Sequence, residues 1–238
     1  MGRALLAEFV GTVLFVFYSS LPTTSSFMIG AAYAALVFAV VHVSGGQLNP
    51  AVSIAAVFSG HMHFVTGGLY ILAQLLGAVA GALLEVAMVP GVGLGHSGSS
   101  PGCFYKGGGV NGVELFLWEV VMTATFIIVL YGVAVALPGH GSLGPVALGF
   151  ATYALSKAGR IYTGAAFNPA RVLGPAFVFL CSWPVIWIYL LAQVLGAVAG
   201  AFIACILYET GLGYGRHAVH GEEGTRETLI SDGIREPV

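Results

Sequence analysis

Two asparagines, each followed by proline and alanine, are the residues whose type and spacing most directly suggest chemistry. The first tripeptide is Asn49-Pro50-Ala51, and the same three residues return at Asn168-Pro169-Ala170. Asparagine is a preferred helix N-cap, and proline is tolerated at the first helical position because no backbone N–H is needed there. Each tripeptide therefore predicts the start of a short helix whose tip carries an amide able to donate hydrogen bonds.

The amino-acid composition indicates the environment in which these tripeptides lie. The chain has 238 residues, of which 58% are hydrophobic and only 8% are charged. Soluble domains carry about a quarter charged residues, so this composition predicts a multi-pass protein surrounded by lipid. The formal net charge is −2 and there is no basic stripe, which argues against nucleic acid as a partner.

Apolar runs predict an all-helical membrane fold with six spanning helices and two half-length helices. The expected spans cover about 4–21, 27–43, 64–89, 113–137, 142–158 and 183–208. The half-helices start at the two prolines and end near 59 and 179. Together they form one channel-like domain, 1–208, and the charged segment 209–238 is predicted to be a disordered tail.

An internal repeat organises these elements. The decapeptide 73–82 is nearly identical to 192–201, with the same offset of 119 positions that separates the two asparagines. The repeat halves, about 4–89 and 113–208, hold three spans each, so the second half must insert upside down. The half-helices then enter from opposite faces and meet near the membrane midplane. The contact faces of packed helices are predicted at Gly77, Gly81, Gly196 and Gly200.

This layout predicts a pore for neutral molecules. Two facing helix N-termini concentrate partial positive charge, and the asparagine amides can hold a passing oxygen. That orientation interrupts a proton wire, and the positive field repels H₃O⁺ and other cations. Arg171, in the first turn after Asn168, is expected to line the pore as a second cation barrier. Irregular backbone before each tripeptide is expected to line the path at Gly45, Gly46, Gln47, Gly164 and Ala166.

Two glutamates occupy matching positions in the first and fourth spans. Glu8 and Glu119 are either proton carriers or, as we favour, buried acceptors for the irregular backbone beside each half-helix. His42, seven residues before Asn49, is the expected partner of Glu8, and a pH-sensing role for it is an alternative.

Metal, disulfide and catalytic sites are not predicted. The three cysteines show no CxxC spacing, so no disulfide or zinc framework is implied. His61, His63, His96 and His140 fall in turns or loops, where we expect them to be solvated. The spans contain no Ser/His, paired Asp or HExxH pattern, so neither an enzyme nor a cofactor is expected.

Residues 4–208 resemble the aquaporin, or major intrinsic protein, family through both Asn-Pro-Ala motifs, Arg171 and the two span glutamates. The resemblance implies a homotetramer with one pore per subunit and both termini in the cytoplasm. It also implies a narrow filter, carried here by spacing from the motifs onto Ile29, Ser156, Ala165 and Arg171.

The filter departs from the usual patterns of that family. Strict water channels usually have an aromatic residue and a histidine where Ile29 and Ser156 stand. Glycerol channels usually have aromatic residues at the first and third positions and an aspartate where Val172 stands. The small residues here are similar to the filters of vacuolar-type plant members. Ala165 also occupies the position of a cysteine that often confers mercury sensitivity, so inhibition by mercury is expected to be weak unless Cys181 or Cys205 is accessible.

We therefore expect a passive channel for water that also passes glycerol, urea or ammonia, because a wider and less polar constriction admits larger neutral solutes. The sequence is compatible with a location in a vacuolar or other internal membrane and with one in the plasma membrane. Two alternatives also remain. One is an ion- or proton-coupled transporter using Glu8, Glu119 and His42, and the other is a non-conducting junctional protein.

Overall fold

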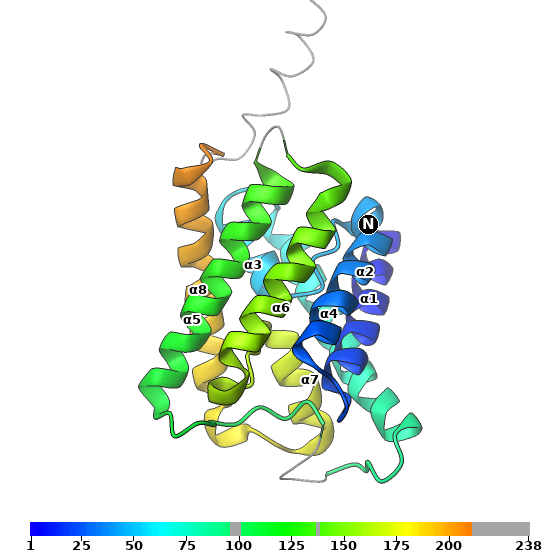
Figure 1. The fold of residues 1–238 in the computed structure, drawn as a ribbon. Coiled ribbons are helices and arrows are strands. Elements are labelled where there is room, and N and C mark those ends of the chain that lie inside the picture. Colours follow the sequence, from blue (N-terminus) through cyan, green and yellow to red (C-terminus); the bar gives the residue numbers. More distant parts are fainter. Residues whose placement is uncertain (96–100, 137–138, 211–238) are drawn as a thin grey trace, which may run out of the picture.

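In the part of the chain that the structure describes, six long helices lie side by side around two short helices that meet in the middle (Figure 1). The computed structural model describes residues 1–95, 101–136 and 139–210, and no strand occurs within them. The long helices are α1 (Gly2–Ser20), α2 (Ser26–Ser44), α4 (Phe64–Met88), α5 (Gly112–Leu130), α6 (Gly144–Thr163) and α8 (Trp183–Leu207). The short ones are α3 (Pro50–Phe58) and α7 (Pro169–Phe179). His96 and the tail beyond residue 210 lie outside the described residues.

Most of the long helices meet the requirements for crossing a membrane. By length and composition, α1, α2, α4, α8 and the segment Gly112–Val135 qualify. Helix α6 is less apolar, but its 20 residues extend about 30 Å and pack along α2. It continues to Thr163 rather than ending near residue 158 as predicted. Arg160 in its last turn donates from Nη1 to the carbonyl of Thr24, 2.8 Å away.

The repeat predicted from the sequence is visible in the packing. Helix α4 packs along α1, and α8 packs along α5 in the same way. A Cβ atom added at Gly77 would lie 2.5 Å from the carbonyl oxygen of Phe9, and one at Gly196 would lie 2.7 Å from that of Val120. Only glycine allows such close approach of two backbones. The predicted glycine contact faces are therefore confirmed.

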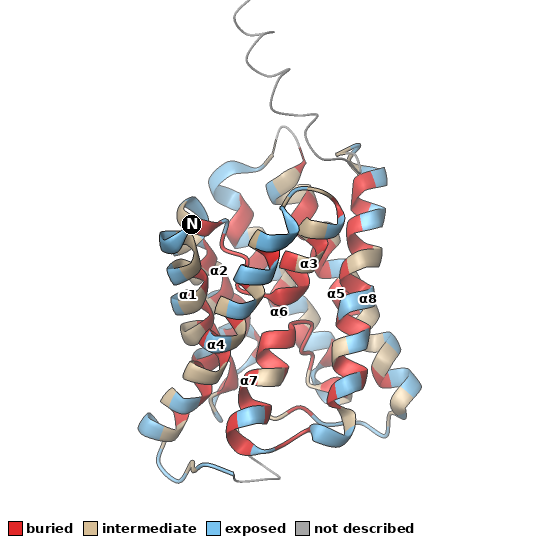
Figure 2. Ribbon diagram, turned by 180° about the vertical axis from the view of Figure 1, so that it is seen from behind, coloured by how far each residue is buried: buried red, intermediate tan, exposed pale blue. Residues whose placement is uncertain are grey.

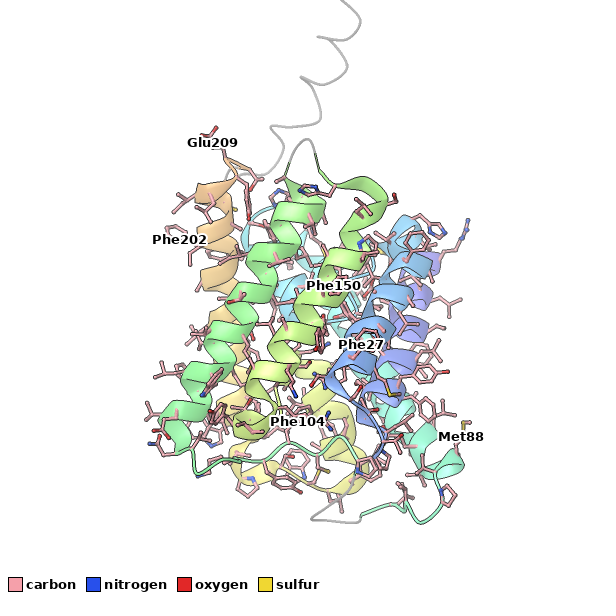
Figure 3. All side chains as sticks on the ribbon, viewed as in Figure 1. Phe27, Met88, Phe104, Phe150, Phe202 and Glu209 are labelled. Atoms are coloured by element: carbon pink, nitrogen blue, oxygen red, sulfur yellow. A yellow bond between two sulfur atoms is a disulfide. The ribbon has the colours of Figure 1, made fainter. Side chains whose placement is uncertain are left out.

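The two halves are inverted relative to each other. In Figure 1, α1 begins and α8 ends at the same end of the molecule, and residues 101–111 cross the opposite end. Buried residues gather on the inner faces of the long helices and on α3 and α7 (Figure 2). Large apolar side chains such as Phe27, Phe150 and Phe202 are exposed on the outside, whereas Phe104 lies inside (Figure 3). This distribution suits a bundle surrounded by lipid.

The end of α5 differs from the uniform helix that the sequence predicted. Residues Tyr131–Val135 form a π-helical turn. The hydroxyl of Tyr131 donates to the carbonyl of Ala55 at 3.0 Å and shares a hydrogen bond with Ser59 Oγ at 2.5 Å. His61 Nδ1 lies 2.8 Å from the same Ser59 oxygen, so this histidine is not simply solvated. The π turn thus ties α5 to the C-terminal end of α3.

Candidate functional site

The two asparagines cap the short helices as their sequence predicts. Asn49 Oδ1 accepts from the backbone N–H of Ala51 at 2.9 Å, and Asn168 Oδ1 accepts from that of Ala170 at 2.9 Å. Each cap is followed by proline at the first helical position. Both asparagines are about 1% exposed, so these caps lie deep in the protein.

The two helix tips are joined by a reciprocal pair of hydrogen bonds. Asn49 Nδ2 donates to the carbonyl of Phe167 at 3.0 Å, and Asn168 Nδ2 donates to that of Leu48 at 3.0 Å. A carboxamide nitrogen carries two hydrogens, so one hydrogen of each amide is used in this pair. The second hydrogen of each amide is left for another acceptor. The arrangement holds both donors at one place between the two half-helices.

The backbone before each tripeptide follows the same irregular path. Left-handed φ angles occur at matching positions in the two repeats: Gly45 (86°), Gly46 (60°) and Leu48 (49°), and Gly164 (81°), Ala165 (56°) and Phe167 (33°). This conformation is costly for residues other than glycine and persists only where the surroundings enforce it. Here the surroundings that enforce it are two buried carboxylates.

Glu8 supports the first irregular segment. Its Oε1 accepts from Ser44 Oγ at 2.6 Å and from the backbone N–H of Gln47 at 2.9 Å. Its Oε2 accepts from the backbone N–H of Leu48 at 2.7 Å and from Gln74 Nε2 at 2.8 Å. The side chain is fully buried, so these donors replace the water that a carboxylate would otherwise need.

Glu119 supports the second irregular segment with an equivalent set of donors. Its Oε1 accepts from Thr163 Oγ1 at 2.6 Å and from the backbone N–H of Ala166 at 3.1 Å. Its Oε2 accepts from the backbone N–H of Phe167 at 2.8 Å and from Gln193 Nε2 at 2.9 Å. Both glutamates are therefore hydrogen-bond acceptors for the backbone that leads to a half-helix.

The prediction that His42 pairs with Glu8 is wrong. His42 is exposed on the last turn of α2, and Ser44 provides the contact with Glu8 instead. A cavity of about 620 Å³ opens beside His42, at the end of the molecule where α1 begins. Gly45, Gly46 and Gln47, which precede the first tripeptide in the chain, also line this cavity.

Arg171 is held rigidly beside the second irregular segment. Its Nη1 donates to the carbonyls of Ala165 at 2.9 Å and Ala166 at 3.1 Å, and its Nε donates to Ser19 Oγ at 3.3 Å. The residue is 3% exposed. Among the described residues, Nη2 has no hydrogen-bond partner. The guanidinium therefore has a fixed position and donors left over for another molecule.

Three aromatic rings surround the same guanidinium. Its Cζ lies 5.7 Å from the ring centre of Phe15, 5.3 Å from that of Phe104 and 5.8 Å from that of Phe167. A cation is attracted to the face of an aromatic ring at such distances. These contacts stabilise a positive charge that burial alone would disfavour.

The other predicted filter residues are also buried. Ile29 and Ala165 belong to one core cluster, together with Phe15 and Phe167. Ser156 on α6 is 1% exposed, and its hydroxyl has no hydrogen-bond partner among the described residues. Of the three, Ala165 contacts Arg171 directly through its carbonyl. The filter role of Ile29 and Ser156 stays a prediction.

Comparison with known proteins decides the family. A model of the family described as Major intrinsic protein matches residues 1–204. The chain belongs to the major intrinsic protein family. Aquaporin TIP1-1 of Arabidopsis thaliana is 35% identical over 228 residues, covering 87% of this chain and 86% of the relative. Nodulin-26 of Glycine max is 35% identical over 221 residues, covering 87% and 79%.

A solved structure has the same fold. The X-ray structure of the aquaglyceroporin from Plasmodium falciparum matches with a TM-score of 0.72 and 21% identity, covering 87% of this chain and 98% of that one. As a member of the major intrinsic protein family, this chain is an integral multi-pass membrane protein and a channel rather than an enzyme.

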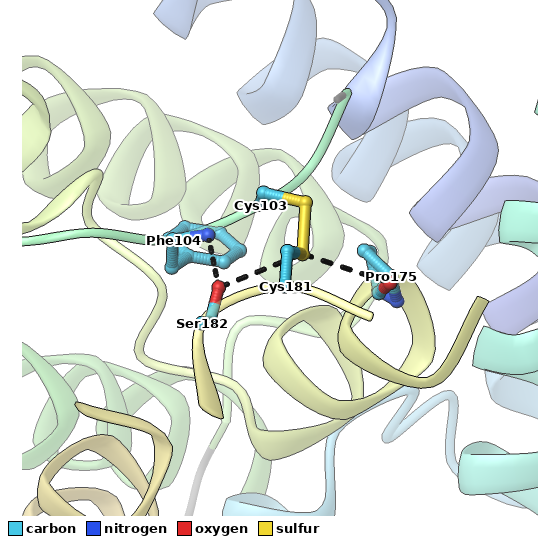
Figure 4. The surroundings of a disulfide bond; sticks show 5 residues. All are labelled: Cys103, Phe104, Pro175, Cys181 and Ser182. Carbon is cyan, nitrogen blue, oxygen red and sulfur yellow. Dashed lines mark hydrogen bonds between the residues drawn. A yellow bond between two sulfur atoms is a disulfide. The ribbon is translucent and has the colours of Figure 1, made fainter. Parts of the chain in front are cut away.

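Two features of this family member were missed by sequence reasoning. Cys103 and Cys181 form a disulfide with a Cα–Cα distance of 6.0 Å (Figure 4), so the prediction of no disulfide is wrong. The two cysteines are 78 residues apart and follow no motif, and only the fold brings them together. Phe104 next to them lies against Arg171, and no pattern in its glycine-rich loop indicated this contact. The third cysteine, Cys205, is free and buried in α8.

Proposed function

We propose that this protein is a passive channel that conducts water and passes small neutral solutes such as glycerol, urea or ammonia while excluding protons and ions. The observation that carries the proposal is the reciprocal hydrogen bonding of Asn49 and Asn168, which leaves one amide hydrogen of each for a passing molecule. Membership of the major intrinsic protein family supports the same function.

The proposed mechanism follows from this geometry. A water oxygen accepts hydrogen bonds from the two asparagine amides, so its own hydrogens point away along the pore in opposite directions. A proton cannot then hop through the centre, because the central oxygen has no lone pair left to receive one. The positive ends of α3 and α7 also oppose a cation at that point.

The filter near Arg171 sets which neutral molecules enter. Arg171 provides a fixed positive charge and free donors for the oxygen of a solute. Ile29, Ser156 and Ala165 leave more width than an aromatic residue and a histidine would. We therefore place the solute-selective constriction at these four residues.

The direct test is stopped-flow light scattering on vesicles containing the purified protein. We expect water permeability well above that of empty vesicles and measurable uptake of at least one of glycerol, urea and ammonia, with no proton leak. Water flux without uptake of any of the three would refute the broader solute range. Flux that saturates or follows a pH gradient would favour a coupled transporter, and permeability equal to that of empty vesicles would favour a junctional protein.

We further propose that the channel is a homotetramer in lipid, with a pore in each 24.5 kDa subunit and with the start of α1 and the end of α8 in the cytoplasm. The disulfide supports this orientation. It lies at the end of the molecule opposite the start of α1, and disulfides persist in oxidising compartments outside the cytosol. Mass measurement of the detergent-solubilised protein is expected to give four chain masses.

Mercury should inhibit the wild-type channel only weakly. Ala165 has no thiol, Cys103 and Cys181 are joined to each other, and Cys205 is 6% exposed. Water permeability measured before and after HgCl₂ tests this expectation. The variant Ala165→Cys is the positive control, because it restores a cysteine at the position where this residue often confers mercury sensitivity in the family, and it should make the channel sensitive. Strong inhibition of the wild type that Cys205→Ser does not remove would mean that the disulfide is absent.

A further inference from the structure

The segment that carries Phe104 is attached to the end of α7 at two adjacent points. Cys103 is bonded to Cys181, and the backbone N–H of Phe104 donates to Ser182 Oγ at 3.0 Å (Figure 4). The covalent bond and the hydrogen bond thus join two neighbouring residues of one segment to two neighbouring residues of the other. This double attachment sets where the Phe104 ring can lie.

The side of the attachment that belongs to α7 is conformationally strained. Leu180 and Ser182, on either side of Cys181, have φ angles of 54° and 66°. Residues other than glycine adopt this left-handed conformation only where neighbouring contacts enforce it. The disulfide is such a contact. Without it, the turn can relax, and Ser182 Oγ can then leave the backbone N–H of Phe104.

The Phe104 ring is the one nearest to Arg171 among the three around its guanidinium. The ring also packs so closely on Gly164 that a Cβ atom added there would lie 2.7 Å from Phe104 Cδ1. Phe104 therefore occupies the space between the guanidinium and the start of the second irregular segment. A displaced ring would leave this space open and remove one cation–π contact.

Other contacts hold the same loop farther along the chain. The backbone N–H of Gly107 donates to the carbonyl of Tyr162 at 2.8 Å. The hydroxyl of Tyr189 donates to the carbonyl of Thr163 at 2.5 Å and also lies 3.3 Å from the carbonyl oxygen of Tyr105. These contacts keep the loop across the pore end when the disulfide is absent. The effect of losing the disulfide should therefore be local to Phe104 and leave the water pathway intact.

We propose that Cys103 and Cys181 are positioning residues for the solute filter, because their disulfide holds Phe104 against Arg171 and so narrows the passage for solutes larger than water. A small dithiol reverses this arrangement by thiol–disulfide exchange. One thiolate attacks one sulfur of the pair to form a mixed disulfide, and the second thiol of the reagent then releases it. Cys103 and Cys181 gain two electrons and two protons, and the reagent leaves as a cyclic disulfide. This inference rests on the proposed channel function.

The test measures water, urea and glycerol permeability on the same vesicles with and without dithiothreitol. Reduction should raise the ratio of solute to water permeability by roughly two- to tenfold, the effect expected from losing one aromatic contact at a buried guanidinium. The double variant Cys103→Ser/Cys181→Ser should show the raised ratio without reductant. Phe104→Ala should show it with the disulfide intact and should not respond to reductant. Cys205→Ser is the matched control and should behave as the wild type.

The possible outcomes distinguish the positioning role of the disulfide from the proposed channel function. Normal water flux with a ratio that neither reduction nor the double variant changes would overturn the positioning role and leave the channel function standing. No water flux in the oxidised wild type would overturn both. If the double variant fails to fold, reduction of already reconstituted wild-type protein gives the same answer. A raised ratio in Phe104→Ala that still increases on reduction would show that the disulfide does not act through Phe104.

Discussion

Glu119→Leu is expected to prevent stable folding, although Glu119 itself need not touch a solute. Leucine fills the space but accepts no hydrogen bond. Four buried donors would then lose their acceptor: Thr163 Oγ1, the backbone N–H groups of Ala166 and Phe167, and Gln193 Nε2. Each buried unsatisfied donor costs about 1–3 kcal/mol, so their sum approaches the roughly 5–15 kcal/mol that stabilises a typical protein.

The experiment compares three variants by size-exclusion chromatography and thermal unfolding in detergent. Glu119→Gln keeps one acceptor oxygen and should be intermediate. Glu114→Leu is the matched control, because Glu114 is an exposed acid on the same helix and accepts from the backbone N–H of Asn111 at 2.7 Å. Losing that capping interaction costs about 1 kcal/mol. We expect Glu119→Leu to aggregate or to melt on the order of 10 °C or more below the wild type. Equal melting of the two leucine variants would contradict the support role of Glu119.

Arg171→Val is expected to make the channel conduct larger solutes and leak protons. The substitution removes a buried positive charge that is held beside Ala165 and Ala166. It also empties the space between the three aromatic rings. We expect urea and glycerol permeability to rise by about tenfold, equivalent to about 1.4 kcal/mol in the barrier, because valine is smaller than arginine and widens the passage. A pH-sensitive dye inside the vesicles should then report a proton flux that is absent in the wild type.

Two further variants separate charge from shape at this position. Arg171→Lys keeps the positive charge but loses the planar fork that contacts two carbonyls at once. It should still exclude protons while discriminating less well between solutes. Arg160→Val is the matched control. Arg160 lies in the last turn of α6, is exposed and donates to the carbonyl of Thr24. Unchanged solute and proton permeability in Arg171→Val would place the selective constriction elsewhere in the pore.

Much of the fold could be predicted because its signals are local or repeated. The Asn-Pro pair starts a helix through interactions within three residues, so α3 and α7 begin where expected. The inverted arrangement followed from counting three spans in each copy of a repeat. The acceptor role of Glu8 and Glu119 was inferred from chemistry, since a buried carboxylate beside irregular backbone finds loose N–H groups.

Other predictions depended on side-chain positions that no local pattern specifies. His42 was chosen as the partner of Glu8 by distance along the chain, but the helix turns it outward and brings Ser44 inward. The π turn at Tyr131 is tied to α3 by a hydroxyl that bonds the carbonyl of Ala55, and no hydropathy pattern encodes such a contact. In both cases the energy that decides the structure comes from residues distant in sequence.

The sequence alone therefore determined the helical architecture, the paired asparagines and the family, because these rest on hydropathy, capping chemistry and repetition along the chain. Only the tertiary structure decided that the asparagines hydrogen-bond across the two half-helices and that the Cys103–Cys181 disulfide places Phe104 against Arg171. Those contacts join segments from different parts of the chain. They form only when the tertiary fold brings those segments together at the end of the bundle.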